Sequence, residues 1–495
     1  MILAKGKWLA VLTAAVLLLA MLPAVSLGSD VSPQRVWRAD GWESDDTSVT
    51  AKVLPEMSYH TFHQDDDDDY AKISAPASGT VFWLEMQATT EAGQDFDSHI
   101  RVYDKDGNQV GFNDDVINNN VYDSGILWEA PAAGDYTVCF EPASGDRGSY
   151  YAYIIEGAYG RRLAGATRFD TAVQVSERLY TGAHNYAFED GPRYAVVANG
   201  RGYADALAGG VLASLDMGPL LLTEPGTLPE VVSDELERLF RQDWYDGDGG
   251  GTVYVLGGTG AVSPAVMAAV EDSPYVDEVV RLAGPTRYGT AAEVASQTAA
   301  DFGGVLSTTA FVVGGYAWPD ALAAGPVAAW NMSPLLLTGK SSVPQETEDA
   351  LSDLGITDIV VVGGAGVVDA AAFTELEGLV SGDVTRVAGA TRYETARAVA
   401  QWGVDEYGMN GEITTLVPGT NFPDALGAAP ISWWFGGPML LTGSASLHPA
   451  VKTFIDDNGR PSYVHDTPNL SYAIGGSGVI SDAALTEWQT YKPAP

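Results

Sequence analysis

Three kinds of residue recur in the same order along this chain, and their chemistry suggests a site that holds an anion. An arginine closes each of three near-identical blocks, Arg-Leu-Ala-Gly-Ala-Thr-Arg, Arg-Leu-Ala-Gly-Pro-Thr-Arg and Arg-Val-Ala-Gly-Ala-Thr-Arg. These closing arginines are Arg168, Arg287 and Arg392. A guanidinium at the start of a helix can hold a carboxylate or a phosphate through two parallel hydrogen bonds. Contact with a ligand and an internal salt bridge are both open for these side chains.

An Asp-Ala-Leu sequence follows each block further along the chain. Its aspartates are Asp205, Asp320 and Asp424. A general base needs a partner acid, nucleophile or metal, but no histidine, cysteine or second carboxylate recurs with these aspartates, and the six histidines share no repeat position. We therefore predict that the aspartates cap helix starts or pair with the arginines, and that the chain is not an enzyme.

A Gly-Gly-x-Gly block completes each copy. Its leading glycine pairs are Gly257 and Gly258, Gly363 and Gly364, and Gly475 and Gly476. Successive backbone N–H groups at such a turn can form a nest that holds an anion. The spacing differs from the G-x-G-x-x-G of dinucleotide-binding turns, so a nucleotide is not the expected ligand.

The elements between the blocks must bring these residues together. In the second copy, residues 279–282, 310–313, 335–337 and 359–362 are short apolar runs typical of strands, and a helix is expected over residues 344–354. Apolar strands that alternate with helices indicate a parallel sheet covered on both faces. The recurring blocks then lie beyond the carboxyl ends of the strands, the edge at which such sheets bind ligands. The sequence thus predicts one functional rim for each copy.

A further recurring block contains an apolar triplet that composition alone identifies as a buried strand. The triplets are Leu220, Leu221 and Leu222, then Leu335, Leu336 and Leu337, then Met439, Leu440 and Leu441. Each copy is of domain length, which is too long for one unit of a solenoid.

In type and order these blocks resemble the cell wall binding repeat type 2 family over about residues 161–491. The resemblance implies three tandem repeats, at residues 161–280, 281–385 and 386–491, each a Rossmann-like or Toprim-like α/β domain and together a pseudo-threefold triangle. It also implies that an exported protein is anchored without a covalent link to an anionic secondary polymer of the cell wall. An Ile-Leu-Leu strand motif is associated with anchoring in that family, and the triplets match it except at their first positions. Because aliphatic side chains cannot recognise phosphate, we expect the triplets to support the site from below.

The N-terminus has the features of an export signal. Lys5 and Lys7 precede an apolar run over residues 8–22, and small residues follow up to Gly28. This order is typical of a secretion signal, and the run is short for a membrane span. We predict a signal peptide over residues 1–28, a flexible leader over residues 29–54, and a mature protein at the cell surface that has no membrane span.

Residues 55–157 show short alternating strands separated by turns, which predicts an antiparallel β-sandwich. The sequence here resembles the bacterial pre-peptidase C-terminal domain, a jelly-roll accessory module of secreted proteins. The only cysteine, Cys139, lies in an apolar strand and is expected to be buried. The acidic run 65–69, together with Asp95, Asp97, Asp114 and Asp115, offers the hard oxygen ligands that suit calcium, with a solvated acidic edge as the alternative. No other cofactor is predicted.

The net charge of −39 excludes a nucleic-acid partner, which requires a basic surface. An anionic polymer must then meet locally concentrated cations or a bridging divalent metal, and the recurring arginines supply that concentration. The sequence favours a surface protein anchored to an anionic wall polysaccharide, with other surface proteins as further partners. An accessory protein of a wall hydrolase or protease, and a subunit of a surface layer, are the alternatives.

Overall fold

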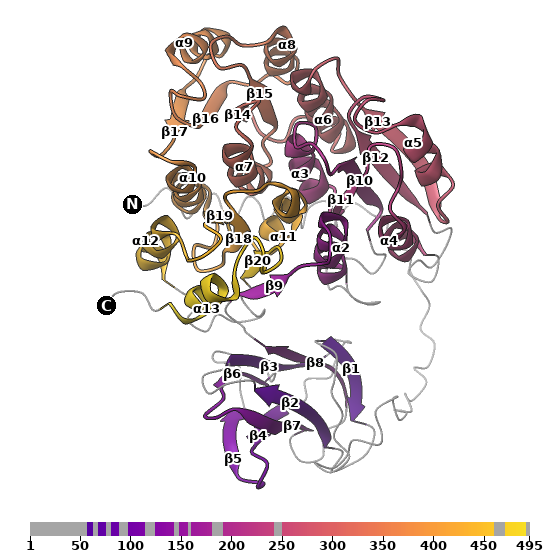
Figure 1. Cartoon of the computed structure of the whole chain (residues 1–495), viewed down its shortest axis with the longest axis vertical. Helices are drawn as coiled ribbons and strands as arrows, with labels where there is room; N and C mark the ends of the chain where they lie inside the picture. Colours follow the sequence, from indigo (N-terminus) through magenta and orange to yellow (C-terminus); the bar gives the residue numbers. More distant parts are fainter. Residues whose placement is uncertain are drawn as a thin grey trace, which may run out of the picture.

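The computed structural model describes residues 57–62, 68–75, 81–88, 98–113, 124–142, 148–156, 160–180, 192–241, 250–459 and 471–491. The predicted signal peptide and leader lie outside this part of the chain. Within the described residues, no helix is both long and apolar enough to cross a lipid bilayer. An all-β domain lies at one end of the molecule and a larger α/β assembly at the other (Figure 1).

Two four-stranded antiparallel sheets form the N-terminal domain, with strand orders β1-β8-β3-β6 and β2-β7-β4-β5. The strands are β1 (Met57–Phe62), β2 (Asp69–Ala75), β3 (Val81–Ala88), β4 (Ser98–Tyr103), β5 (Gln109–Asn113), β6 (Ser124–Glu129), β7 (Gly134–Pro142) and β8 (Gly148–Glu156). Their alternation separates core from solvent, since Ala71 and Ile73 of β2 are buried whereas Lys72 and Ser74 are exposed. The predicted sandwich is therefore confirmed, and Cys139 is buried within it.

Three parallel four-stranded sheets form the α/β assembly, with orders β11-β10-β12-β13, β15-β14-β16-β17 and β19-β18-β20-β9. The first unit comprises α2 (Arg168–Leu179), β10 (Tyr194–Asn199), α3 (Ala206–Leu215), β11 (Leu220–Thr223), α4 (Glu230–Phe240), β12 (Gly251–Leu256), α5 (Pro264–Glu271) and β13 (Val276–Leu282). The second comprises α6 (Arg287–Asp301), β14 (Thr309–Gly314), α7 (Trp318–Trp330), β15 (Leu335–Thr338), α8 (Gln345–Asp353), β16 (Asp358–Val362), α9 (Ala370–Leu379) and β17 (Val384–Val387). The third comprises α10 (Arg392–Tyr407), β18 (Thr415–Pro418), the 3₁₀-helix η2 (Pro423–Ala428), α11 (Ala429–Trp434), β19 (Met439–Thr442), α12 (Pro449–Asn458), β20 (Tyr472–Ile474), α13 (Asp482–Thr490) and β9 (Arg161–Leu163).

The sheets are offset from the sequence repeats by one strand. The strand that opens the second repeat, β13, pairs with β12 of the first unit, and β17 pairs in the same way with β16. The strand that opens the first repeat, β9, pairs with β20 at the far end of the chain. The first and last repeats are thereby joined, and the assembly closes into a ring.

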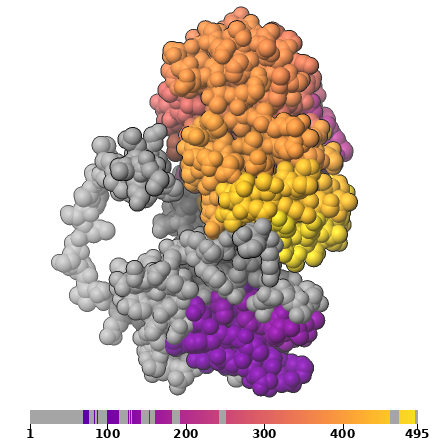
Figure 2. Space-filling view, turned by 90° about the vertical axis from the view of Figure 1, so that its left-hand side faces the viewer, coloured from indigo at the N-terminus to yellow at the C-terminus, as the bar shows by residue number. Residues whose placement is uncertain are grey.

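The three units meet along their central helices. Helices α3, α7 and α11 contact one another in every pairing, and they lie at the middle of the α/β assembly in Figure 1. Small residues allow this close approach, because a Cβ on Gly210 of α3 would lie 2.8 Å from the Cβ of Ala429 in α11. The predicted pseudo-threefold arrangement is confirmed. In the side view of Figure 2, the C-terminal residues (yellow) lie between the sandwich (purple) and the residues that precede them in the chain (orange).

Candidate functional site

Each recurring arginine faces the aspartate of the preceding unit. Arg287 lies near Asp205, Arg392 near Asp320, and Arg168 near Asp424, so that each attraction favours the ionised carboxylate. The third pair joins the last unit to the first, as the closed ring requires. Three corresponding sites therefore lie between units, whereas the sequence predicted one rim within each copy.

The arginines hold the loops that follow the first strand of their own unit. Their Nη1 atoms donate to the carbonyls of Gly200, Gly315 and Gly419, at 2.6, 2.7 and 2.9 Å. Among the described residues, no carboxylate forms an ion pair with any of the three guanidiniums. Since a guanidinium has five N–H donors, one bond to a carbonyl leaves donor capacity for a ligand. The arginines that open the blocks contact the glycine turns instead, since Arg162, Arg281 and Arg386 donate to the carbonyls of Gly475, Gly257 and Gly363.

The prediction that the aspartates cap helices is wrong. Asp205 stands at the N-cap position of α3, but within the described chain its side chain makes no capping hydrogen bond. Asp320 and Asp424 lie in the first turn of α7 and η2. Burial raises the pKa of Asp205 and of Asp424, and the nearby hydroxyls of Thr290 and Thr171, each from the next unit, oppose that rise.

Three recurring threonines also stand at these sites, although the sequence analysis did not single them out. Thr171, Thr290 and Thr395 are buried, and their hydroxyl oxygens accept hydrogen bonds from the backbone N–H groups of Gly165, Gly284 and Gly389 at 3.1, 3.3 and 3.1 Å. Thr171 and Thr290 thus connect the arginine loop of one unit to the aspartate of its neighbour. A Thr-Ala pair recurs after the aromatic residue of each block, and that recurrence was the available clue.

The first glycine of each pair makes room for the aspartate of its own unit. The backbone φ angles of Gly257, Gly363 and Gly475 are +92°, +114° and +119°. Residues that carry a Cβ atom rarely adopt such angles. A Cβ would lie 2.5, 2.8 and 3.2 Å from the Oδ2 atoms of Asp205, Asp320 and Asp424. Their N–H groups donate to the carbonyls of Leu282, Val387 and Leu163. The predicted anion nest therefore cannot use these N–H groups, which leaves Gly258, Gly364 and Gly476 as its remaining members.

Two of the sites open into cavities. The cavity between the second and third units measures about 550 Å³ and is lined by Asp320, Arg392, Lys340, Thr338, Tyr316 and Trp318 among others. The cavity between the third and first units measures about 400 Å³ and is lined by Asp424, Arg168, Arg201 and Asn421 among others. Gly364 lies at the first cavity and Gly476 at the second. Both volumes are suited to a small-molecule group or a segment of a polymer.

The apolar triplets are buried strands, one in each unit. Every residue of the three triplets is 2% exposed or less. The Thr that follows each triplet ends the strand, and Thr338 lines the larger cavity. The triplets therefore have no surface with which to touch a ligand, in keeping with a supporting position.

We expect Asp320→Asn to remove a pH dependence of folding stability. Asp320 is 5% exposed, and burial raises its pKa to about 6, partly offset by the positive charge of Arg392. Because the folded chain then holds its proton more tightly than the unfolded chain, this group destabilises the fold as pH rises from about 4 to about 6. The wild-type free energy of unfolding should fall by about 2 kcal/mol over that window relative to the variant. Denaturant titrations at pH 4 and pH 7.5 measure this difference, and parallel curves for the two proteins would contradict it.

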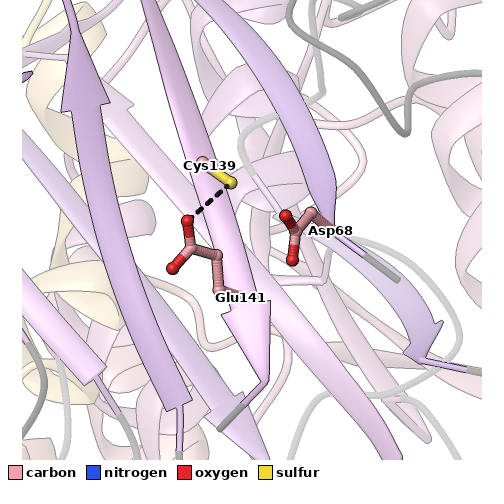
Figure 3. A group of neighbouring side chains, drawn as sticks. All are labelled: Asp68, Cys139 and Glu141. Carbon is pink, nitrogen blue, oxygen red and sulfur yellow. Dashed lines mark hydrogen bonds between the residues drawn. The ribbon is translucent and has the colours of Figure 1, made fainter. Parts of the chain in front are cut away.

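In the sandwich, three side chains that metals favour lie together. Asp68, Cys139 and Glu141 have potential ligand atoms within 4.8 Å of one another (Figure 3). The thiol of Cys139 donates to Glu141 Oε1 at 3.4 Å, and Glu141 also forms an ion pair with Arg101 at 2.7 Å. Burial and the charge of Glu141 raise the pKa of the Cys139 thiol. Since a metal requires the thiolate, we assign this group a hydrogen-bonding role. The predicted calcium ligands Asp95, Asp97, Asp114 and Asp115 lie outside the described residues.

Comparisons with known proteins agree with the repeats. The family described as cell wall binding domain 2 matches residues 162–267, 281–372 and 386–485. The N-acetylmuramoyl-L-alanine amidase LytC of Bacillus subtilis (strain 168) is 28% identical over 316 residues, which are 63% of this chain and 57% of that protein. Cwp8 from Clostridium difficile is 25% identical, with a TM-score of 0.54 over 67% of this chain and 52% of that chain. Cwp6 from the same organism is 19% identical, with a TM-score of 0.57 over 89% of this chain and 69% of that chain. The chain thus spans little more than half the length of LytC and of Cwp8.

Proposed function

The chain belongs to the cell wall binding domain 2 family, and on that premise we propose that it is an exported surface protein held at the cell wall without a covalent link. Its ligand is an anionic secondary polymer of the wall, which enters the sites between successive units. One observation carries this proposal: at each of two cavities, an arginine of one unit faces an aspartate of the neighbouring unit. The pairs are Arg392 with Asp320 and Arg168 with Asp424. Recurrence along a ring suits a ligand that is itself a repeating chain, since several weak contacts on one polymer add through avidity.

The charge of the protein supports a localised mode of binding. A chain with a net charge of −39 repels an anionic polymer at long range, but that repulsion is screened within about 8 Å at physiological salt. Cationic groups are concentrated at the cavities, where Arg392 and Lys340 line one and Arg168 and Arg201 line the other. Short-range contacts at these cavities can therefore outweigh the repulsion from the rest of the surface.

Retention on purified cell envelopes tests the proposal. We expect a chain produced from Ser29 onward to bind intact envelopes and to lose most of that binding, at least about tenfold, once the anionic polymers have been stripped. Arg287→Ala should weaken retention and leave the melting temperature nearly unchanged, because other bonds hold the loop that its guanidinium contacts. Equal retention on stripped and intact envelopes would overturn the proposal. A large fall in melting temperature for Arg287→Ala would assign that arginine a structural role instead.

We propose a binding role and no catalytic role for the repeats. The recurring arginine, aspartate and threonine are not accompanied by a histidine or cysteine at any shared position. The arginine and threonine at each site are already hydrogen-bonded to backbone groups, which suits a rigid binding site.

A second candidate function is to assist a wall hydrolase, because LytC, to which the chain is similar over its repeats, is an amidase. Cell wall digestion by a purified amidase, with and without this protein, separates the two functions. An increase in the digestion rate would favour the accessory role.

A further inference from the structure

The three sites between units are not chemically equivalent, and the one between the second and third units differs most. Tyr316 lies four residues before Asp320, and the residues four before the corresponding aspartates are Arg201 in the first repeat and Thr420 in the third. Lys340, two residues after the strand that ends in Thr338, occupies the position of Pro225 and Ser444. Both Tyr316 and Lys340 line the 550 Å³ cavity. The other two repeats have no aromatic residue at the position of Tyr316 and no cation at that of Lys340, whereas the position of Trp318 is aromatic in all three, as Tyr203 and Phe422.

Two aromatic side chains form one side of the cavity. Tyr316 is 71% exposed, and its ring is stacked on the guanidinium of Arg287, 4.1 Å from the ring centroid. Trp318 is half-buried, with the guanidinium of Arg392 5.3 Å from its ring centroid. The ring of Trp318 also packs edge-on against that of Phe422 in the third unit, with the two ring centroids 6.0 Å apart. These contacts hold both rings in place while a face of Tyr316 remains open to solvent.

A buried hydroxyl in the same cavity has no partner. Thr338 is completely buried, and its Oγ1 atom makes no hydrogen bond with any described residue. Its counterparts are satisfied, since Thr223 Oγ1 donates to the carbonyl of Thr227 at 3.2 Å and Thr442 Oγ1 donates to that of Ser446 at 3.4 Å. A buried polar group left unpaired destabilises a protein. The unpaired hydroxyl of Thr338 at the edge of this cavity therefore suggests that a polar group of a ligand supplies its missing hydrogen bond.

We propose that this cavity binds one pyranose ring that carries an acidic substituent, and that it is the sugar-specific site among the three. The apolar face of the sugar packs on Tyr316 and Trp318, since aromatic rings offer a large apolar surface at little entropic loss. The acidic group meets Lys340 and Arg392, and a sugar hydroxyl pairs with Thr338. This inference rests on the proposed function, of which it specifies the ligand at one site. The remaining sites, which lack counterparts of Tyr316 and Lys340, contact the polymer through its charges.

Small probes separate the sugar contribution from the charge contribution. Glucose 6-phosphate, glucuronate, glucose and inorganic phosphate are titrated into the whole chain by calorimetry. We expect the two sugar acids to bind at least about tenfold more tightly than glucose or inorganic phosphate. Tyr316→Ala should lower the affinity for the sugar acids by about three- to tenfold without changing the affinity for phosphate. Lys340→Gln should lower the affinity for every acidic probe. Both side chains are exposed, so neither change should lower the melting temperature.

Thr420→Ala is the matched control, because it changes the equivalent position of the third repeat, and it should leave every affinity unaltered. The inference is overturned if Tyr316→Ala binds the sugar acids as the wild type does, if Thr420→Ala weakens them equally, or if none of the probes binds. In each of those cases, undiminished retention on intact envelopes leaves the proposed wall binding in place. Loss of the difference between intact and stripped envelopes would overturn wall binding itself.

Discussion

Removing the short strand β9 is expected to unfold the rest of the third α/β unit, although β9 precedes its partner strand β20 by more than 300 residues in the sequence. We compare a chain that begins at residue 158 with one that begins at residue 165, so that both lack the sandwich and only the first retains β9. The loss should be about 3–5 kcal/mol, the sum of the burial of Leu163 and of the hydrogen bonds that flank it. Calorimetry and hydrogen exchange of β18 and β20 measure the effect.

The contacts of β9 explain this expectation. The N–H group of Arg161 donates to the carbonyl of Ser471 at 3.0 Å, and Gly475 donates to the carbonyl of Leu163 at 2.9 Å. The side chain of Arg162 bonds to the carbonyl of Gly475 and forms an ion pair with Asp482 at 3.1 Å. Without the strand, β20 becomes an edge whose backbone groups are unpaired.

A circular permutant supplies the control. In the first two units a four-residue connection leads from α5, ending at Glu271, to β13, and from α9, ending at Leu379, to β17. Residues 491–494 would provide a connection of the same length from α13 to a relocated β9. A chain of residues 165–494 followed by residues 161–164 should regain the lost stability. Equal melting of the two truncated chains, or no recovery in the permutant, would show that β9 does not close the ring.

The strands and helices of the repeats could be predicted because their patterns are local. The expected strand 335–337 and the expected helix 344–354 correspond to β15 and α8, where apolar runs and turn residues mark the elements. The sheet to which β13 belongs could not be predicted. Asp277 and Glu278 near its start are exposed and only Leu282 is buried, so its place is set by pairing with β12, which precedes it by a whole helix.

The roles of the site residues were hidden for the same physical reason. An aspartate at a helix start favours capping when only neighbouring residues are considered. In the fold, the hydroxyl of Thr290 comes from another unit and lies beside the carboxylate of Asp205. Local propensity is outweighed where a buried carboxylate finds a donor in a neighbouring unit. Arg392 likewise lies near Asp320 only because α10 packs against α7, and the order of the blocks does not reveal that packing.

Gly363→Ala is expected to destabilise the second unit by about 3 kcal/mol, whereas Gly364→Ala should change its stability by less than about 0.5 kcal/mol. The two adjacent glycines differ in backbone and in surroundings. Gly363 has a φ of +114°, and a Cβ there would lie 2.8 Å from Asp320 Oδ2. A Cβ on Gly364 would have no atom outside its immediate chain neighbours within 4 Å. Chemical denaturation of the two variants measures the difference.

A double variant separates strain in the backbone from collision with the carboxylate. Asp320→Ala removes the atom that the new Cβ would meet but leaves the φ of residue 363 unchanged. Because alanine in a left-handed conformation costs about 1–2 kcal/mol on its own, the loss caused by Gly363→Ala should fall to about that value when measured in an Asp320→Ala background. The two substitutions are then coupled by about 1–2 kcal/mol, as expected of groups in contact. If the losses simply added, the glycine would be required by the turn alone, and the close fit between it and the aspartate would have no energetic consequence.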